Sequence, residues 1–412
     1  MQRISILLIL TIISLFGYSQ EKVFNCFTIV AGKNATADGS VMLAHNEDDY
    51  GKQVVNIYKV PQKQDTEEIQ LQQGGIITTN LPTASYLWLE MPGMSFSDCF
   101  MNEYGVTIVS NQCTSREDTP EITDGGIMYQ LRKQIAEQST SARHAVSIAT
   151  KLLQQWGYNS SGRTYTIADT KEAYILAVVN GKHWAAVRVP DDKVAVIPNY
   201  YTLTNIDLSD TINFIVSPDI IEYATSRGWY TPATDGEFNF RLAYADTNSL
   251  KHPVNIGRMW RGVNLLANKA YDYNDAFPTF FSPEKAITPN MLMNILRDHF
   301  EGTTYYYAET EGLENPHQNE GTICAAHNQY GLVAQLRSDM PVEIGAMMWL
   351  AMRRPCCEAF VPWYSGISEV PQGYTRYDYK CRAEPLCSRR RNLGSNSCSR
   401  LFYLRRLCRF CR

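Results

Sequence analysis

The feature that most constrains this chain is a cysteine at the start of a predicted β-hairpin. Cys26 directly precedes the β-prone run Phe27–Val30. Asp38-Gly39 is a strong turn signal, and Ser40–Ala44 is again apolar and strand-like. The pattern therefore predicts two antiparallel strands, with Cys26 at the open end of the pair.

The register of this hairpin predicts which side chains surround the cysteine. If Lys33 pairs with Ser40, Cys26 lies opposite Glu47, and directly opposed side chains have Cβ atoms about 5 Å apart. The polar run His45–Asp48 then crowds around the thiol. A carboxylate there would hold an α-ammonium group of Cys26 by a charge-assisted hydrogen bond. Two other interpretations stay open: a merely polar strand end, and a buried or disulfide-bonded Cys26.

The segment before the hairpin is typical of a secretion signal. A basic start at Arg3 leads into the apolar or hydroxyl-bearing run Ile4–Phe16, and small residues follow at Gly17–Ser19. We interpret residues 1–19 as a signal peptide and 20–25 as a short propeptide, which predicts export to the periplasm or the extracellular space. No other segment approaches the roughly 18 consecutive apolar residues of a membrane span.

Removal of residues 1–25 would make Cys26 the first residue of the mature chain. It would then carry both a nucleophilic thiol and a free α-amino group, and the pKa of such an amine is about 8. The amine is therefore close enough to neutrality to act as the general base of its own thiol. No partner histidine is needed.

Charge is distributed unevenly along the chain. The 412 residues carry a formal net charge of −4, and 44% of them are hydrophobic, enough for a large core in one or two domains. Residues 380–412 contain nine Arg, one Lys and one Glu, so the rest of the chain has a net charge of −13. Nothing in this acidic body suggests a nucleic-acid partner.

We interpret the Cys- and Arg-rich tail, residues 380–412, as the product of a reading-frame change or of an aberrant gene model. A genuine basic tail that binds an anionic surface is the alternative. Six cysteines lie outside the tail and show no zinc-ligand spacing, so we expect no metal; packing is the role expected for Cys356, Cys357 and His327. The six are Cys26, Cys99, Cys113, Cys324, Cys356 and Cys357.

Residues 26–379 predict a single α+β domain with antiparallel sheets, because strand patterns are followed by paired helices and then by more strands. Strands are expected at 84–89, 98–101, 106–110, 163–168, 173–179, 184–189 and 194–198, with a late hairpin formed by 322–326 and 331–336. Helices are expected at 127–138, 141–156, 255–269 and from Pro289 to about Phe300, the last one capped by Thr288.

Short motifs occur in a fixed order through this domain. They are Cys26–Lys33, Asp38–Ser40 and Ala44–Asp48; Met101–Gly105 with Ser110-Asn111; Trp184–Arg188 with Pro198-Asn199; Ala243–Asp246 with Gly257–Arg261; and Thr322–Ala325 with Gln335–Arg337 and Pro362–Tyr364. The ordered set resembles the cysteine dipeptidases of the N-terminal-nucleophile (Ntn) hydrolase superfamily, the family that includes the secernins.

This resemblance implies a four-layer αββα sandwich that matures by cleavage before Cys26. It also implies hydrolysis of dipeptides, or of similar small amides with a free amino end, without a metal or an organic cofactor. More distant relatives of the family are the penicillin V acylases and the bile-salt hydrolases, which cut other amides.

The resemblance also implies roles for individual residues. Cys26 matches the nucleophile and Asp48 the acid that orients the amino terminus. Asn111 and Asn199 resemble the asparagines that stabilise the oxyanion, and loss of such a donor typically costs on the order of 3 kcal/mol. Arg258 resembles an arginine that favours the thiolate. The alternatives are turn or strand-end positions for the two asparagines and a surface position for the arginine.

Two further residues are substrate-binding candidates. Many relatives have arginine at the position of His45, and histidine titrates near pH 6.5 whereas arginine is always charged. His45 is therefore expected to supply a pH-dependent charge or to shape the substrate pocket. Arg261 is an alternative to Arg258.

The leading hypothesis is an exported cysteine dipeptidase that acts on small peptides, with no membrane association after signal removal and with a homo-oligomer left open. Two alternatives remain. One is an Ntn amidase or acylase of the penicillin V acylase or bile-salt hydrolase kind, acting on N-acyl amides. The other is a non-catalytic exported binding protein.

Overall fold

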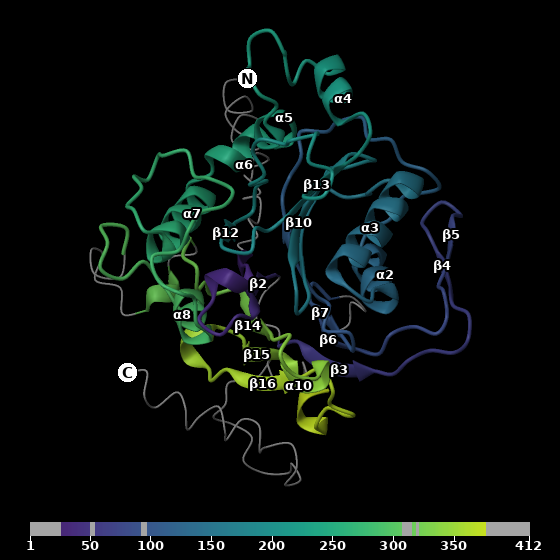
Figure 1. Ribbon diagram of the computed structural model, residues 1–412, viewed down its shortest axis with the longest axis vertical. Helices are drawn as coiled ribbons and strands as arrows, with labels where there is room; N and C mark the ends of the chain where they lie inside the picture. The colour runs from purple at the N-terminus through teal and green to yellow at the C-terminus, as the bar shows by residue number, and fades with distance from the viewer. Residues whose placement is uncertain (1–25, 50–53, 92–96, 307–314, 319–320, 376–412) are drawn as a thin grey trace, which may run out of the picture.

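Two β-sheets lie face to face, and helices cover their outer faces (Figure 1). The computed structural model describes residues 26–49, 54–91, 97–306, 315–318 and 321–375. The predicted signal peptide, propeptide and tail (380–412) lie outside the described residues. Among the helices that are described, each is too short or too polar to cross a bilayer.

The first sheet has six strands and contains the predicted hairpin at its centre. Its spatial order is β12-β1-β2-β14-β15-β16, and every neighbouring pair is antiparallel. The strands are β1 (Phe27–Ala31), β2 (Val41–Asp48), β12 (Val194–Ile197), β14 (Asn328–Leu336), β15 (Ala346–Met352) and β16 (Val361–Tyr364).

The second sheet has eight strands in the order β13-β11-β10-β9-β8-β7-β6-β3, again antiparallel. They are β3 (Asn56–Val60), β6 (Tyr86–Glu90), β7 (Phe100–Asn102), β8 (Thr107–Gln112), β9 (Arg163–Ala168), β10 (Ala173–Val178), β11 (Trp184–Arg188) and β13 (Phe214–Val216). A separate hairpin pairs β4 (Glu68–Gln70) with β5 (Ile76–Thr78).

Two helix pairs form the outer layers, on opposite sides of the sheets in Figure 1. α2 (Gln130–Gln138) and α3 (Ala142–Trp156) pack on the eight-stranded sheet, and α7 (Pro253–Leu266) and α8 (Pro289–Leu296) pack on the six-stranded sheet. The predicted four-layer αββα sandwich is thus confirmed. The shorter helices are α4 (Ile220–Ser226), α5 (Phe240–Tyr244), α6 (Thr247–Lys251), α10 (Val342–Gly345) and the 3-10 turns η1 (Lys33–Ala35), η2 (Pro316–Gln318), η3 (Pro355–Cys357) and η4 (Gln372–Tyr374).

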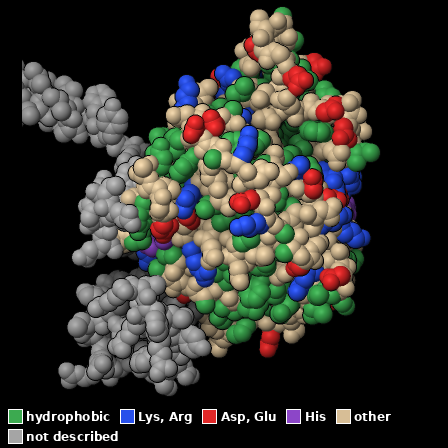
Figure 2. Space-filling model, turned by 60° about the vertical axis from the view of Figure 1, so that its left-hand side comes forward, with side chains coloured by type: hydrophobic (Ala, Val, Ile, Leu, Met, Phe, Trp, Pro, Cys, Tyr) green, Lys and Arg blue, Asp and Glu red, His purple; other side chains and the backbone are tan. Residues whose placement is uncertain are grey.

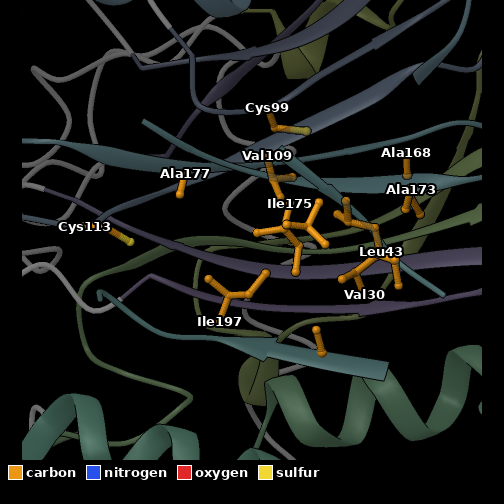
Figure 3. Packing of buried hydrophobic residues seen from close by; sticks show 14 of the residues in the cluster. Val30, Leu43, Cys99, Val109, Cys113, Ala168, Ala173, Ile175, Ala177 and Ile197 are labelled. Carbon is orange, nitrogen blue, oxygen red and sulfur yellow. The ribbon is translucent and has the colours of Figure 1, made fainter. Parts of the chain in front are cut away.

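The main apolar core lies between the two sheets. Figure 3 shows Val109 and Ile175 of the eight-stranded sheet against Val30 and Leu43 of the hairpin, all fully buried. Successive side chains of a strand point to opposite faces. The neighbours of these core residues, such as Ile29 and Ala44, therefore pack outward against α7 and α8.

On the described part of the face seen in Figure 2, basic and acidic side chains are intermixed.

The predicted late hairpin is wrong in one strand. Residues 331–336 are part of β14, but β14 pairs with β2 and β15 and not with 322–326. Side-chain hydrogen bonds shape that loop: Thr322 Oγ1 donates to the Cys324 carbonyl, and Asn328 Oδ1 accepts from the Ala325 amide. Such local bonds give the backbone an alternative to a sheet ladder.

Candidate active site

The register of β1 and β2 is the one predicted. Thr28 pairs with His45 and Phe27 with Asn46, a pattern that places Cys26 opposite Glu47. The Cys26 Sγ atom lies 3.5 Å from Glu47 Oε1 and 3.6 Å from the Asp48 carbonyl oxygen. Period-2 alternation turns Cys26, Thr28, His45 and Glu47 to the same side, toward the second sheet.

These side chains form a continuous buried hydrogen-bond chain. Thr28 Oγ1 donates to Asn111 Oδ1 at 2.6 Å and lies 2.7 Å from His45 Nδ1. His45 Nε2 lies 2.9 Å from Glu47 Oε2, and the other carboxyl oxygen of Glu47 faces the Cys26 thiol. Asn111 on the second sheet is thereby linked to the cysteine on the first.

The pKa values of the chain members agree with one set of proton positions. Burial, and then the charge of Arg163, lowers the pKa of His45 to about 3, so the imidazole is neutral near pH 7. Burial, and then the charge of Asp49, raises the pKa of Glu47 to about 8. Because the Thr28 hydroxyl proton is used on Asn111, His45 donates from Nδ1 and its Nε2 accepts from a protonated Glu47.

The remaining oxygen of Glu47 can then accept from the Cys26 thiol. Burial, and then the charge of Glu47, raises the pKa of the thiol well above its usual value. In the chain that still carries residues 1–25, Cys26 is therefore a thiol and not a thiolate at neutral pH. A base must reach it before it can act as a nucleophile.

Arg258 of α7 holds the backbone of the cysteine. Its Nη1 donates to the Cys26 carbonyl, and its Nη2 donates to Asn199 Oδ1 (3.0 Å) and Asn255 Oδ1 (2.9 Å). The side chain is fully buried, which excludes the surface position considered above. Burial lowers the pKa of Arg258 to about 10, with the charges of Cys26 and Asp48 opposing this shift, so it stays a cation at neutral pH.

Asn111 and Asn199 lie at the ends of neighbouring segments, and the side-chain amide of each donates one hydrogen bond to a backbone carbonyl. Asn111 Nδ2 donates to the Ile197 carbonyl at 3.0 Å, and Asn199 Nδ2 donates to the Gln112 carbonyl at 2.9 Å. An amide NH₂ has two donors. Each side chain therefore has a second N–H in addition to the one in its backbone bond.

The structure separates the remaining candidates. The Asp48 carboxyl is buried at the end of β2, and its charge acts on both Cys26 and Arg258. Arg261 instead forms a two-point ion pair with Asp298, at 2.9 and 2.6 Å, in the loop after α8. Arg261 is thus outside the hydrogen-bond chain that contains Cys26, and its predicted substrate contact stays untested.

Sequence reasoning missed Thr28, Arg163 and Asn255. Thr28 was recoverable, because it stands two residues after Cys26 and so shares its strand face. Arg163 begins a strand of the other sheet, where Nη1 binds Asp98 Oδ1 (2.8 Å) and Ser110 Oγ (2.9 Å). Burial raises the pKa of Cys26, and the charge of Arg163 opposes part of this rise. No local signal marks such a cross-sheet contact.

Comparison with known proteins extends this picture to the family. A family model described as "Peptidase family C69" matches residues 25–385. The chain belongs to peptidase family C69. This confirms the resemblance to the cysteine dipeptidase family and the prediction of a cysteine-type peptide hydrolase.

Among curated relatives, a "Probable dipeptidase" of Salmonella dublin is 27% identical over 371 residues, 85% of this chain and 83% of that protein. A "Probable dipeptidase B" of Streptococcus pyogenes serotype M1 is 25% identical over 403 residues, 92% of this chain and 79% of that protein.

Among solved structures, penicillin V acylase from Agrobacterium tumefaciens aligns with a TM-score of 0.39 at 12% identity, over 79% of this chain and 82% of that one. A conjugated bile acid hydrolase mutant from Clostridium perfringens aligns with a TM-score of 0.37 at 11% identity, over 82% and 96%. The layer order of this C69 chain is established by its own sheets and helices.

Proposed function

We propose that this protein is an exported cysteine dipeptidase whose nucleophile is Cys26, exposed as the N-terminal residue by removal of residues 1–25. The observation that carries the proposal is the setting of Cys26. Its thiol faces Glu47 at 3.5 Å while the buried Arg258 guanidinium binds its carbonyl. A cysteine that only fills space in an apolar core does not need a carboxyl group beside its thiol and a guanidinium on its carbonyl.

The proposed reaction begins with the new α-amino group of Cys26, which takes the thiol proton. The thiolate attacks the scissile carbonyl carbon, forming a C–S bond and moving the carbonyl electron pair onto oxygen. The α-ammonium then gives its proton to the leaving amine as the C–N bond breaks. Water, deprotonated by the same α-amine, attacks the thioester, and the second tetrahedral intermediate releases the acid and returns the thiol.

The residues around Cys26 have separate proposed roles. The second N–H groups of Asn111 and Asn199 donate to the oxyanion, where a preorganised donor is worth on the order of 3 kcal/mol. Asp48 holds the α-ammonium. Arg258 fixes the Cys26 backbone and Asn199 relative to each other, because one guanidinium binds both.

Dipeptides are the proposed substrates because the family is a peptidase family and the relatives above are named as dipeptidases. The acidic body of the chain also favours substrates that carry a free ammonium group. N-acyl amides remain the alternative, and a direct competition between the two classes separates them.

The test is turnover by the mature protein with three substrate sets: unmodified dipeptides, the same dipeptides N-acetylated, and N-acyl amides such as penicillin V. We expect the unmodified dipeptides to be hydrolysed, the acetylated forms to be cut at least about 100-fold more slowly, and Cys26→Ala to be inactive. Preference for N-acyl amides would establish the acylase alternative. Tight binding without turnover of any set would establish the binding-protein alternative.

A further inference from the structure

Four side chains of the types that bind metals meet behind strand β2, and they come from separate parts of the chain. His299 follows α8, His317 lies in η2, Cys324 lies in the loop before β14, and Cys356 lies in η3. One ligand atom from each residue lies within 4.8 Å of all the others. Three of the four residues are buried, and Cys356 is half-buried.

The Nε2 atom of His317 lies close to the other three ligand atoms. His317 Nε2 lies 3.1 Å from His299 Nε2, 3.2 Å from Cys356 Sγ and 3.6 Å from Cys324 Sγ. A tetrahedral zinc ion, with bonds of about 2.1 Å to nitrogen and 2.3 Å to sulfur, separates its ligand atoms by about 3.4 to 3.8 Å. The four ligand atoms lie within 4.8 Å of one another, so the widest separation in the set would shrink by about 1 Å on binding an ion.

We propose that His299, His317, Cys324 and Cys356 form a structural site for Zn²⁺. Two thiolates and two imidazoles are a donor set that zinc prefers, and four protein ligands leave no open position for a catalytic water. Two thiolates also neutralise the charge of the ion.

Groups outside the ligand set orient the two imidazoles for this role. His299 Nδ1 lies 2.8 Å from Glu301 Oε1, the carboxylate–histidine arrangement that directs Nε2 to a metal. His317 Nδ1 lies 3.2 Å from Asn315 Oδ1 and 3.4 Å from Arg354 Nη1. With Nε2 on the ion, His317 Nδ1 keeps its proton and donates to Asn315, and Arg354, which can only donate, then makes no hydrogen bond to this nitrogen.

The ion would link the loops that pack against β2. Asn46, between His45 and Glu47, donates to the carbonyls of Leu296 and Ile323, which stand close in sequence to His299 and Cys324. Arg297 also donates to the Pro355 carbonyl in η3. The site therefore joins four segments behind the strand that carries His45 and Glu47, while acting independently of the proposed reaction.

Thiol oxidation is the competing fate of these cysteines. Cys356 Sγ lies 3.4 Å from Cys357 Sγ and also near Cys324. A disulfide would remove two thiols but would leave two facing imidazoles without a role. The paired imidazoles, each with an oxygen partner on the other ring nitrogen, favour the metal.

The test is metal analysis of the full-length chain purified without chelators. We expect one zinc ion per chain, and we expect Co²⁺ substitution to give the intense visible and thiolate charge-transfer bands of a tetrahedral site. The background carries Cys408→Ser and Cys411→Ser, so that the C-x-x-C pair of the tail contributes no metal. In that background Cys324→Ser weakens Zn²⁺ binding by more than about 100-fold, while the matched control Cys357→Ser keeps the metal.

Three results would overturn the site. One is absence of tetrahedral cobalt bands in the folded parent protein with Co²⁺ in excess. Another is metal binding that is equal in the Cys324→Ser and Cys357→Ser proteins. The third is a Cys324–Cys356 or Cys356–Cys357 disulfide in the freshly purified protein, seen as a mass lower by two hydrogens. If Cys324→Ser does not fold, the cobalt spectrum of the parent protein decides.

Discussion

At the scale of single residues, Glu47 is the centre of the site. One carboxyl oxygen faces the Cys26 thiol and the other faces His45, and the whole group is buried. A protonated Glu47 satisfies both neighbours at once, whereas the carboxylate leaves a buried charge beside a neutral imidazole. The stability of the fold should therefore depend on pH through this pair.

The pKa shifts of Glu47 and His45 give the direction in which stability changes with pH. The pKa of Glu47 rises from 4.5 to about 8, so its contribution is fully present below pH 4.5 and is lost as the pH rises through 8. The pKa of His45 falls from 6.5 to about 3, so its contribution is present above pH 6.5 and is lost as the pH falls through 3. Between pH 4.5 and 6.5 the Glu47 contribution falls with pH as fast as the His45 contribution rises. The summed contribution of this pair to the free energy of unfolding is therefore predicted to be constant in this range.

Glu47→Gln should remove the loss of stability that ionisation of Glu47 causes above pH 6.5, because glutamine reproduces the protonated carboxyl and does not ionise. In the Cys26→Ala background, which keeps one N-terminus in all samples, we expect Glu47 to contribute about 2 kcal/mol to the fall in the free energy of unfolding between pH 6.5 and 8. Glu47→Gln should make the fall smaller by this amount, as measured by urea denaturation, while the contribution of His299 stays. The exposed Glu121→Gln serves as control, and an unchanged fall in Glu47→Gln would refute the proton positions.

Arg258 and Arg261 provide a second contrast at this scale, since they stand three residues apart on α7. Lysine cannot reproduce the fork that binds the Cys26 carbonyl, Asn199 and Asn255 together. We expect Arg258→Lys to lower kcat/KM for a dipeptide by about 100-fold, and Arg261→Lys to change it by less than about 3-fold. Equal losses would mean that Arg261 binds substrate after all.

How far single residues could be predicted depended on sequence distance. The pairing of Cys26 with Glu47 follows from a local turn and from strand period, so it was predictable. Arg163, and the cluster of His299, His317, Cys324 and Cys356, depend on contacts between distant segments. Spacing along the chain carries no trace of them.

At the scale of elements, the close approach of α7 to β1 positions Arg258 over Cys26. Gly262 makes this approach feasible: a Cβ there would lie 2.7 Å from Phe27 Cζ and 2.9 Å from Val196 Cγ1. Five residues earlier, a Cβ on Gly257 would meet only ordinary contacts, the nearest at 3.4 Å from Phe300 and Tyr273.

These two glycines should therefore respond oppositely to alanine. Gly262→Ala should destabilise the fold by about 1–3 kcal/mol through overpacking, and it should reduce activity by moving α7 away from Cys26. Gly257→Ala should stabilise it by up to about 1 kcal/mol, the gain in helix propensity. Thermal and urea unfolding of both variants decide the point; destabilisation by Gly257→Ala equal to that by Gly262→Ala would contradict it.

Element boundaries were predictable where the signal is local. Thr288 caps α8 as expected, with its hydroxyl accepting from the Met291 amide, and Ser141 caps α3 in the same way through the His144 amide. The predicted helix from Pro289 runs four residues too far, because the chain turns after Leu296 and Phe300 adopts a positive φ of 71°. That turn carries Asp298 and His299 to partners far away in sequence, which no helical pattern foretells.

At the scale of the whole molecule, the sandwich places the start of β1 between its two sheets, beside residues from both. The family model begins one residue before Cys26, at residue 25, and extends to residue 385. The proposed mechanism requires cleavage of the peptide bond before Cys26 within this fold. Cleavage before Cys26 would create the α-amine next to Glu47 and Asp48 and would supply the base that the buried thiol lacks.

The most direct measurement is therefore the N-terminal sequence and the intact mass of the exported protein, for wild type and for Cys26→Ala. The account predicts a wild-type chain that begins at Cys26 and a Cys26→Ala chain that retains residues 20–25. A wild-type chain that begins at Gln20, stays unprocessed and still hydrolyses dipeptides would contradict it, because the α-amine of Cys26 would not exist.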